Sequence, residues 1–217
     1  MDFRTVAGKS VRRPIDVEDL PSSDLSLSGP FVYSDCQAED VDQSAVVGQG
    51  SLHHVVVSQS SLAESRFTEL ELSDVALRHV AVSNASWEQA SARRVEVVGC
   101  QAIGLRLGLV KAEDLYLEDC KLDYARVDVE RQRGVVVFHR CTFREATLGG
   151  DLSGMVFSEC EFAGAEFQAR RAVDCDMTSS RLVGASGLLT LAGASITEDQ
   201  AVTLAGQLAA EVGFVIS

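Results

Sequence analysis

The sequence predicts an all-β solenoid in which the chain turns a corner every five residues. From Leu52 to Val127 an apolar residue occupies every fifth position, beginning with Leu52, Val57, Leu62 and Phe67. A helix face would recur every three or four residues and a half-buried strand every two, so neither accounts for this period. A second residue, usually small or apolar, lies two positions earlier in most repeats and is also expected to point inward. These residues are Ser60, Ser65, Val75, Val80, Ala85, Ala90, Val95, Cys100, Val110, Cys120 and Ala125.

Four repeats of five residues make a coil of 20 residues, and stacking the sequence at that interval tests the prediction. Leu62, Val82, Ala102 and Leu122 fall into one column of similar residues. A four-sided coil accounts for this alignment. We expect its interior to be filled by side chains, leaving no pocket.

The five-residue period slips once and then recovers. Gln132 interrupts it, and Phe138 continues it one residue late, as do Phe143 and Leu148. From Leu152 to Leu182 the apolar residues return to the original phase. One residue is therefore gained between Gln132 and Phe138 and one is lost before Leu152, which restores the 20-residue coil.

Four of the six cysteines follow the same interval. Cys100, Cys120 and Cys160 are separated by multiples of 20, and Cys141 joins them once the extra residue is subtracted. Adjacent coils should lie about 4.8 Å apart, as strands in a sheet do. The favoured interpretation is a column of small buried residues; disulfide or metal chemistry is the alternative.

Several repeats resemble those of the pentapeptide-repeat family, which has a small residue, a polar or acidic residue and a central Leu or Phe. The segments are SLAESRFTEL, CKLDYARVDV, CTFREATL and CEFAGAEFQA, and the resemblance covers residues 31–187. It implies a right-handed quadrilateral β-helix, here of about seven coils.

The two ends of the chain lack the strong repeat. Residues 1–30 predict an N-terminal arm or cap, and residues 31–51 predict an irregular first coil with a weak period at Phe31, Cys36, Val41 and Val46. Residues 188–217 predict a helix that begins with a capping box at Thr197 and ends in an apolar tail, together covering the last coil. Members of the family with similar C-terminal helices are often dimers, which implies a homodimer through this end. The expected dimerisation residues are Leu204, Leu208, Val212, Phe214, Val215 and Ile216.

The net charge of −13 is unevenly distributed. Residues 52–182 contain twenty acidic and fifteen basic residues, a net charge of only −5. The N-terminal residues show no secretory signal, and no apolar run approaches the roughly 20 residues that span a bilayer. We therefore expect a cytoplasmic protein that contacts neither a membrane nor nucleic acid directly.

Outward-facing charges are the candidate interaction site. Arg93 and Arg94 should lie one coil from Glu113 and Asp114, as complementary ladders do. Arg66, Arg106 and Arg126 form a separate basic stripe. The candidate partner-binding residues are Glu113, Asp114, Glu118, Asp119, Asp123, Arg131 and Arg133.

Motifs for catalysis, cofactor binding or metal binding are absent from the sequence. The four histidines have no carboxylate or nucleophile at a recognised spacing, and there is no glycine-rich phosphate loop. We therefore expect a protein without enzymatic activity and without a cofactor.

Two functions remain open. The first is an interaction scaffold that binds an unidentified protein partner through its outer faces, with the deformation after Gln132 as one candidate contact. The second, implied by a resemblance to quinolone-resistance and toxin-immunity members of the family, is imitation of duplex DNA. Such a rod would compete with DNA or drug on DNA gyrase or another type II topoisomerase and give quinolone or toxin protection.

Overall fold

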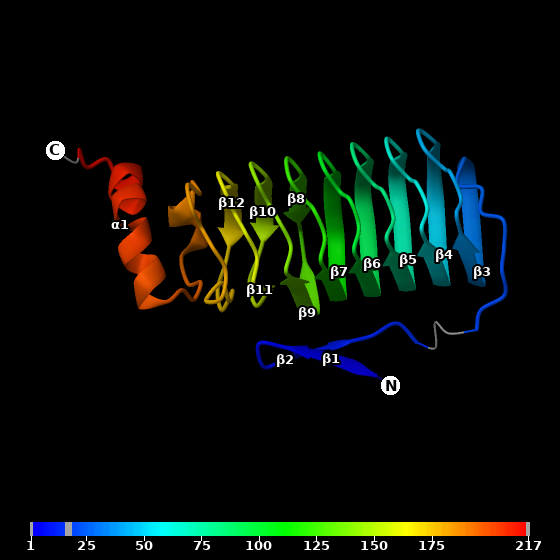
Figure 1. The fold of residues 1–217 in the computed structure, drawn as a ribbon, viewed down its shortest axis with the longest axis horizontal. Helices are drawn as coiled ribbons and strands as arrows, with labels where there is room; N and C mark the ends of the chain where they lie inside the picture. Colours follow the sequence, from blue (N-terminus) through cyan, green and yellow to red (C-terminus); the bar gives the residue numbers. More distant parts are fainter. Residues whose placement is uncertain (1, 16–18, 216–217) are drawn as a thin grey trace.

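A computed structural model describes residues 2–15 and 19–215 and confirms the predicted β-solenoid. Figure 1 shows stacked coils that form a rod, with a helix across one end. The main elements of the rod are β3 (Gly29–Glu39), β4 (Val47–Ser58), β5 (Arg66–Arg78), β6 (Ser86–Val98), β7 (Arg106–Glu118), β8 (Arg126–Val129), β9 (Gln132–His139), β10 (Thr147–Asp151), β11 (Val156–Ser158) and β12 (Glu166–Arg171). The remaining elements are β1 (Phe3–Val6), β2 (Lys9–Arg12), the 3-10 helix η1 (Leu188–Leu191) and α1 (Glu198–Val212).

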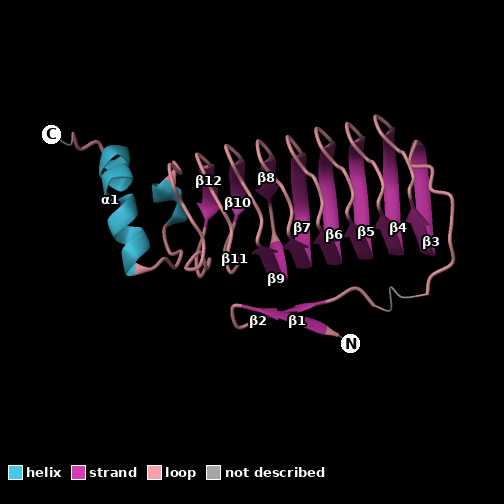
Figure 2. Ribbon diagram, viewed as in Figure 1, coloured by secondary structure: helices cyan, strands magenta, loops and turns pink. Residues whose placement is uncertain are grey.

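Parallel pairing between coils confirms the 20-residue register. Phe67 of β5 pairs with Trp87 of β6, which pairs with Leu107 of β7 and then with Val127 of β8. The strands therefore stack side by side along the rod, as Figure 2 shows. Each coil buries the same columns of side chains, so the core is continuous along the rod.

The backbone makes its corners at the predicted interval. Gln59, Glu64, Asp74, His79 and Asn84 all have a left-handed backbone conformation, with φ between 49° and 60°. These residues are separated by five positions or by ten. Such a conformation is uncommon outside glycine, so its recurrence marks a repeated turn rather than a local irregularity.

Both predicted changes of phase are present. Ala112 pairs with Gln132 but Leu115 pairs with Val136, so β9 contains one extra residue around Gly134. Later the register shifts between Gly150 and Asp151, where β10 is one residue short of β12. A Cβ atom on Gly150 would lie 2.0 Å from the carbonyl oxygen of Val129, so only glycine allows this close approach.

One predicted inward residue is wrong. Ala90 pairs with Leu109 and Ser91 with Lys111, so Val110 is the additional residue of a bulge in β7. Leu109 is buried in its place, while Val110 is only half-buried. Because a one-residue shift reverses the direction of each side chain, the bulge exchanges the two residues between core and surface.

The first coil has 19 residues, which explains its weak period. Cys36 pairs with Val55, so the residues of the weak period occupy the earlier of the two inward positions. Gln43 and Gly48 stand where the other coils have a central apolar residue. Leu27 covers this end instead: its N–H donates to Gln43 Oε1 at 2.8 Å, and a Cβ on Gly48 would lie 2.2 Å from its carbonyl oxygen.

The N-terminal residues form two separate structures. Leu25 and Leu27 are buried against the first coil and close it. Further upstream, β1 and β2 form an antiparallel hairpin with a turn at Ala7 and Gly8. The hairpin lies along the side of the rod rather than at its end (Figure 1) and contacts β7 and β9.

The C-terminal helix α1 covers the last coil. Its predicted capping box is present, with Thr197 and Gln200 each accepting a backbone N–H of the other. Leu204 is buried against the coil, and the carboxylate of Glu211 accepts the N–H groups of Leu188 and Leu189. Within the described residues, no helix has the length and apolar character needed to cross a membrane.

Candidate interaction surface

The interior of the rod is almost filled, and its cysteines serve as hydrogen-bond donors. Each thiol of the cysteine column donates to a backbone carbonyl oxygen of the preceding coil. The pairs are Cys100 with Leu77, Cys120 with Val97, Cys141 with Leu117 and Cys160 with Phe138, at 3.7, 3.5, 3.7 and 3.4 Å. Ser180 continues the column by donating to Phe157 at 2.8 Å. The column therefore combines small volume with a donor for each corner carbonyl.

All six cysteines are free and buried. Burial raises the pKa of Cys175 to about 12 and raises the pKa of Cys141 well above the ordinary value. A protonated thiol neither attacks as a nucleophile nor ligates a metal. The thiols of Cys141 and Cys175 are therefore suited to packing and hydrogen bonding rather than to chemistry.

The expectation of a core without a pocket is wrong in one place. A cavity of about 50 Å³ lies between the coils of β6 and β7. Its walls include Trp87, Cys100, Ala102 and Cys120. The cavity arises because Ala102 occupies a central position where other coils have Leu, Val or Phe, and its lining is apolar.

The predicted acidic residues lie close together, but cations of the same chain neutralise many of them. Glu113 Oε2 lies 2.8 Å from Lys111 Nζ and its other oxygen 3.9 Å from Arg93 Nε, which confirms the Arg93–Glu113 half of the predicted ladder. Arg94 pairs with Asp74 instead of Asp114. Asp119 accepts two hydrogen bonds from Arg140, both of 2.8 Å. Lys111 holds the pKa of Glu113 below its ordinary value, and Arg140 does the same for Asp119.

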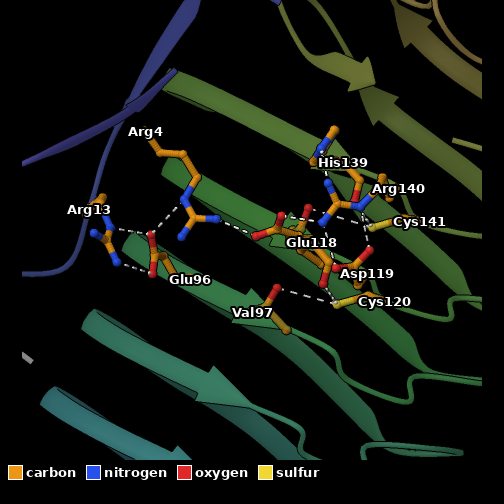
Figure 3. Close-up of polar contacts among 11 residues, drawn as sticks. Arg4, Arg13, Glu96, Val97, Glu118, Asp119, Cys120, His139, Arg140 and Cys141 are labelled. Atoms are coloured by element: carbon orange, nitrogen blue, oxygen red, sulfur yellow. Dashed lines mark hydrogen bonds and ion pairs between the residues drawn. The ribbon is translucent and has the colours of Figure 1, made fainter. Parts of the chain in front are cut away.

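Two of the predicted acidic residues lie against the N-terminal hairpin. Asp114 is buried, 3.8 Å from Arg12 Nε. Glu118 lies between Arg4 and Arg140 and contacts both guanidinium groups (Figure 3). Asp123, by contrast, remains half-buried on the rod and accepts the N–H of Arg144 at 3.0 Å.

Glu96 is the centre of the hairpin contact, although the sequence did not single it out. Its side chain is only 4% exposed, and it binds Arg13 through Nε at 2.8 Å and Nη2 at 3.4 Å. Arg4 Nε lies 3.5 Å from the same carboxylate, and Figure 3 shows both arginines pointing toward Glu96. The guanidinium of Arg4 also lies 4.4 Å from the centre of the Tyr116 ring, a cation–π distance.

A second buried ion pair lies beside this contact. Asp74 and Arg94 occupy the same corner of adjacent coils, and Arg94 donates two hydrogen bonds to the Asp74 carboxylate. The backbone N–H of Ile15 donates to Asp74 at 3.2 Å. Burial alone would raise the pKa of Asp74, but the hydrogen bonds from Arg94 and Ile15 outweigh it and lower that pKa.

The two arginines predicted at the deformation after Gln132 remain exposed. Arg131 and Arg133 flank Gln132 at the start of β9, next to the extra residue. Among the described residues, neither forms an ion pair within 4.0 Å. They differ in this respect from Arg4, Arg13 and Arg140.

The predicted dimerisation residues divide between two environments. Leu204 is buried and Leu208 is half-buried against the last coil, so both contribute to the cap of their own chain. Val212, Phe214 and Val215 are exposed by 58%, 69% and 94%. Ile216 lies outside the described residues.

The histidines provide no metal site in the part of the chain that the structure describes. His54 Nδ1 lies 2.7 Å from Asp35, and His139 Nδ1 lies 3.2 Å from Ser158 Oγ. No group of three or more His, Cys, Asp or Glu residues there could hold a metal ion.

Two open grooves on the rod surface, of about 670 and 660 Å³, have mixed polar and apolar walls.

Comparisons with known proteins found similarity only among solved structures. No family model matches the chain, and no curated protein does. A trypsin-treated QnrB1 variant, a plasmid-mediated fluoroquinolone resistance protein, is 20% identical over 88% of this chain and 97% of its own, with a TM-score of 0.46. Full-length QnrB1 is 17% identical over 79% of this chain and 99% of its own, with a TM-score of 0.38. HetL, a pentapeptide repeat protein involved in heterocyst differentiation regulation from the cyanobacterium Nostoc sp. strain PCC 7120, is 12% identical over 78% of this chain and 87% of its own, with a TM-score of 0.32.

Proposed function

We propose that this chain is a non-enzymatic interaction scaffold whose outer faces bind a protein partner. The observation that carries the proposal is the contrast between charged residues that are paired within the chain and those that are not. Most of the acidic patch is neutralised, whereas Arg131 and Arg133 are exposed without an ion pair among the described residues. Unpaired arginines beside a structural irregularity suit a protein contact, because arginine is enriched in interfaces.

A pull-down that compares two matched double variants tests this proposal. We expect Arg131→Glu/Arg133→Glu to lose a partner that the wild type captures. Arg66→Glu/Arg106→Glu reverses two exposed arginines on another column and should keep it. Equal partner sets for all three proteins would contradict a contact at Arg131 and Arg133.

Imitation of DNA at a type II topoisomerase is the second candidate, and the net charge of −13 favours it. The elongated rod in Figure 1 is also a suitable shape. The ion pairs of Glu113, Glu118 and Asp119 count against it, because a phosphate mimic requires carboxylates that are free to meet the enzyme's cations. A gyrase supercoiling assay with and without ciprofloxacin tests it. If micromolar protein neither inhibits gyrase nor protects it from the drug, this candidate is ruled out.

We also propose that two copies associate through the C-terminal end. The exposed apolar side chains of Val212, Phe214 and Val215 support this arrangement, because burying them would remove apolar surface from water. Light scattering should report a dimer for the wild type and a monomer for Phe214→Asp/Val215→Asp. A wild-type monomer would exclude the dimer.

A further inference from the structure

The face beneath the N-terminal hairpin has an unusual composition for the outside of a solenoid. One outward-facing column there contains Val56, Ala76, Glu96, Tyr116 and Val137, and all five are at most 4% exposed. The same column has the polar residues Gln37 and Asp176 near the two ends of the rod. In this column, the apolar residues therefore lie where the N-terminal segment covers them.

The covering segment matches this column in both charge and apolar character. Val11 packs on Tyr116 and Val137, and Leu20 packs on Val56 and Ala76. Between these apolar contacts, Arg13 and Arg4 meet Glu96. Complementary charges across a contact fix its register and select its partner.

The hairpin is attached to the rod without extending its sheet. Its two strands pair only with each other, as a separate two-stranded sheet. The described contacts of β1 and β2 with the rod are made by side chains. Two-stranded hairpins are marginally stable alone, so this one depends on contacts that water can replace.

The carboxylates are built into the face, whereas the cations lie over it. The side chains of Glu96 and Asp114 are 4% and 7% exposed, while those of Arg4, Arg13 and Arg12 are 29%, 33% and 47% exposed. Removing the hairpin would return the carboxylates to water without changing the coils. Another segment with the same chemistry could then occupy the same positions.

We propose that this face is a binding surface for an extended protein segment in which arginines lie beside aliphatic residues, and that the hairpin occupies it in the free protein. The proposal deepens the scaffold function and rests on it. The hairpin competes with such a partner. The apparent affinity of the partner is therefore lower than its affinity for the uncovered face, because binding must also displace the hairpin.

A labelled peptide copying residues 2–15 is the probe for this surface. Its fluorescence anisotropy is measured against the full-length wild type and against full-length Val11→Asp/Arg13→Glu, whose own hairpin should be released. We expect the variant to bind the peptide about ten-fold more tightly than the wild type does. Binding should weaken as salt is raised from about 0.05 to 0.5 M, because ion pairs contribute to it.

Variants of the face provide the control. Adding Glu96→Lys to the released variant should abolish peptide binding, whereas adding Glu69→Lys, at an exposed residue of β5 outside this column, should preserve it. Circular dichroism verifies that each variant keeps its β-solenoid.

The proposal is overturned by any of three results in folded protein. These are no binding to the released variant at up to about 1 mM peptide, equal binding to wild type and released variant, or binding that Glu96→Lys leaves unchanged. The scaffold function has its own test: partner capture that depends on Arg131 and Arg133 would stand even if the peptide did not bind.

Discussion

Between Ala90 and Leu122 the core is built from aliphatic residues, alanine and cysteine, whereas between Phe138 and Phe167 it also contains five phenylalanine rings. The first region contains the cavity of about 50 Å³. In the second, the rings of Phe143 and Phe162 stack with centroids 4.9 Å apart, and those of Phe138 and Phe157 do so at 5.1 Å. The five-residue repeat is therefore compatible with very different packing, because it fixes where side chains point and not how well they fill the space.

The largest effect should come from removing a ring from the phenylalanine region. Phe157 contacts Phe138, Phe143 and Phe162, and it is 1% exposed. Phe157→Ala should lower the free energy of unfolding by about 3–5 kcal/mol, measured by urea denaturation. Phe3→Ala, at a residue 49% exposed in the hairpin, is the control and should cost less than about 0.5 kcal/mol. Similar losses for both variants would contradict the comparison.

The cavity predicts that one substitution will have opposite effects in the two regions. Ala102→Val adds two methyl groups at the cavity wall and should stabilise the protein by about 0.5–2 kcal/mol. Ala172→Val adds them at a fully buried site beyond Phe167 and should destabilise it by about 1–3 kcal/mol through overpacking. Thermal unfolding of both variants measures the difference. A loss of stability in Ala102→Val would mean that the side chain cannot use this space.

Thiol labelling should distinguish the regions more finely. Cys100 and Cys120 border the cavity, whereas Cys160 lies among phenylalanine rings and Cys175 is completely buried. A small reagent such as methyl methanethiosulfonate at pH 8 should therefore modify Cys120 first, because its hydrogen bond with Cys100 lowers the pKa of Cys120 and raises that of Cys100. Mass spectrometry would show the order of modification. Cys175 should react only on unfolding, because its pKa of about 12 keeps the thiol protonated at that pH. Early modification of Cys175 would contradict this order.

The smallest effect should be a dependence of the free energy of unfolding on acidic pH, and it should come from Asp74. The lowered pKa of Asp74 stabilises the folded state above the ordinary aspartate pKa. That contribution is lost as the pH falls through the lower pKa of the folded state. Asp74→Asn should therefore flatten the fall in stability between about pH 5 and pH 2, measured by urea denaturation across that range. An unchanged slope would show that other carboxylates determine it.

The regular part of the fold could be predicted because it repeats. The period of five, the interval of 20 and the compensated slip after Gln132 each recur along the chain, so errors at one residue are corrected by the next coil. Val110 was assigned wrongly because a bulge changes register without changing composition: Leu109 and Val110 are both apolar. The 19-residue first coil was obscured for a related reason, since Leu27 from outside the repeat takes the place of a core residue.

The hairpin contact could not be predicted from the repeat, because it joins residues that are far apart in the sequence. Glu96 and Arg13 are 83 positions apart, and neither lies in a recognisable motif. One signal was present, however. Val56, Ala76, Tyr116 and Val137 follow the coil interval at a position that should face solvent, and such a column indicates that another segment covers it.

The side chain of Gln200 gives the rod its finite length. Its Nε2 donates to the carbonyl oxygens of Met177 and Ser180, at 2.8 and 2.6 Å. In the column that begins at Cys100, these are the acceptors that a further coil would have used, and one amide group supplies both bonds. With these two carbonyls satisfied and α1 across its end, the solenoid is a poor template on which the next molecule could continue the stack. Gln200 thus helps to close this end of the sheet, which disfavours the fibrous growth to which open parallel sheets are prone.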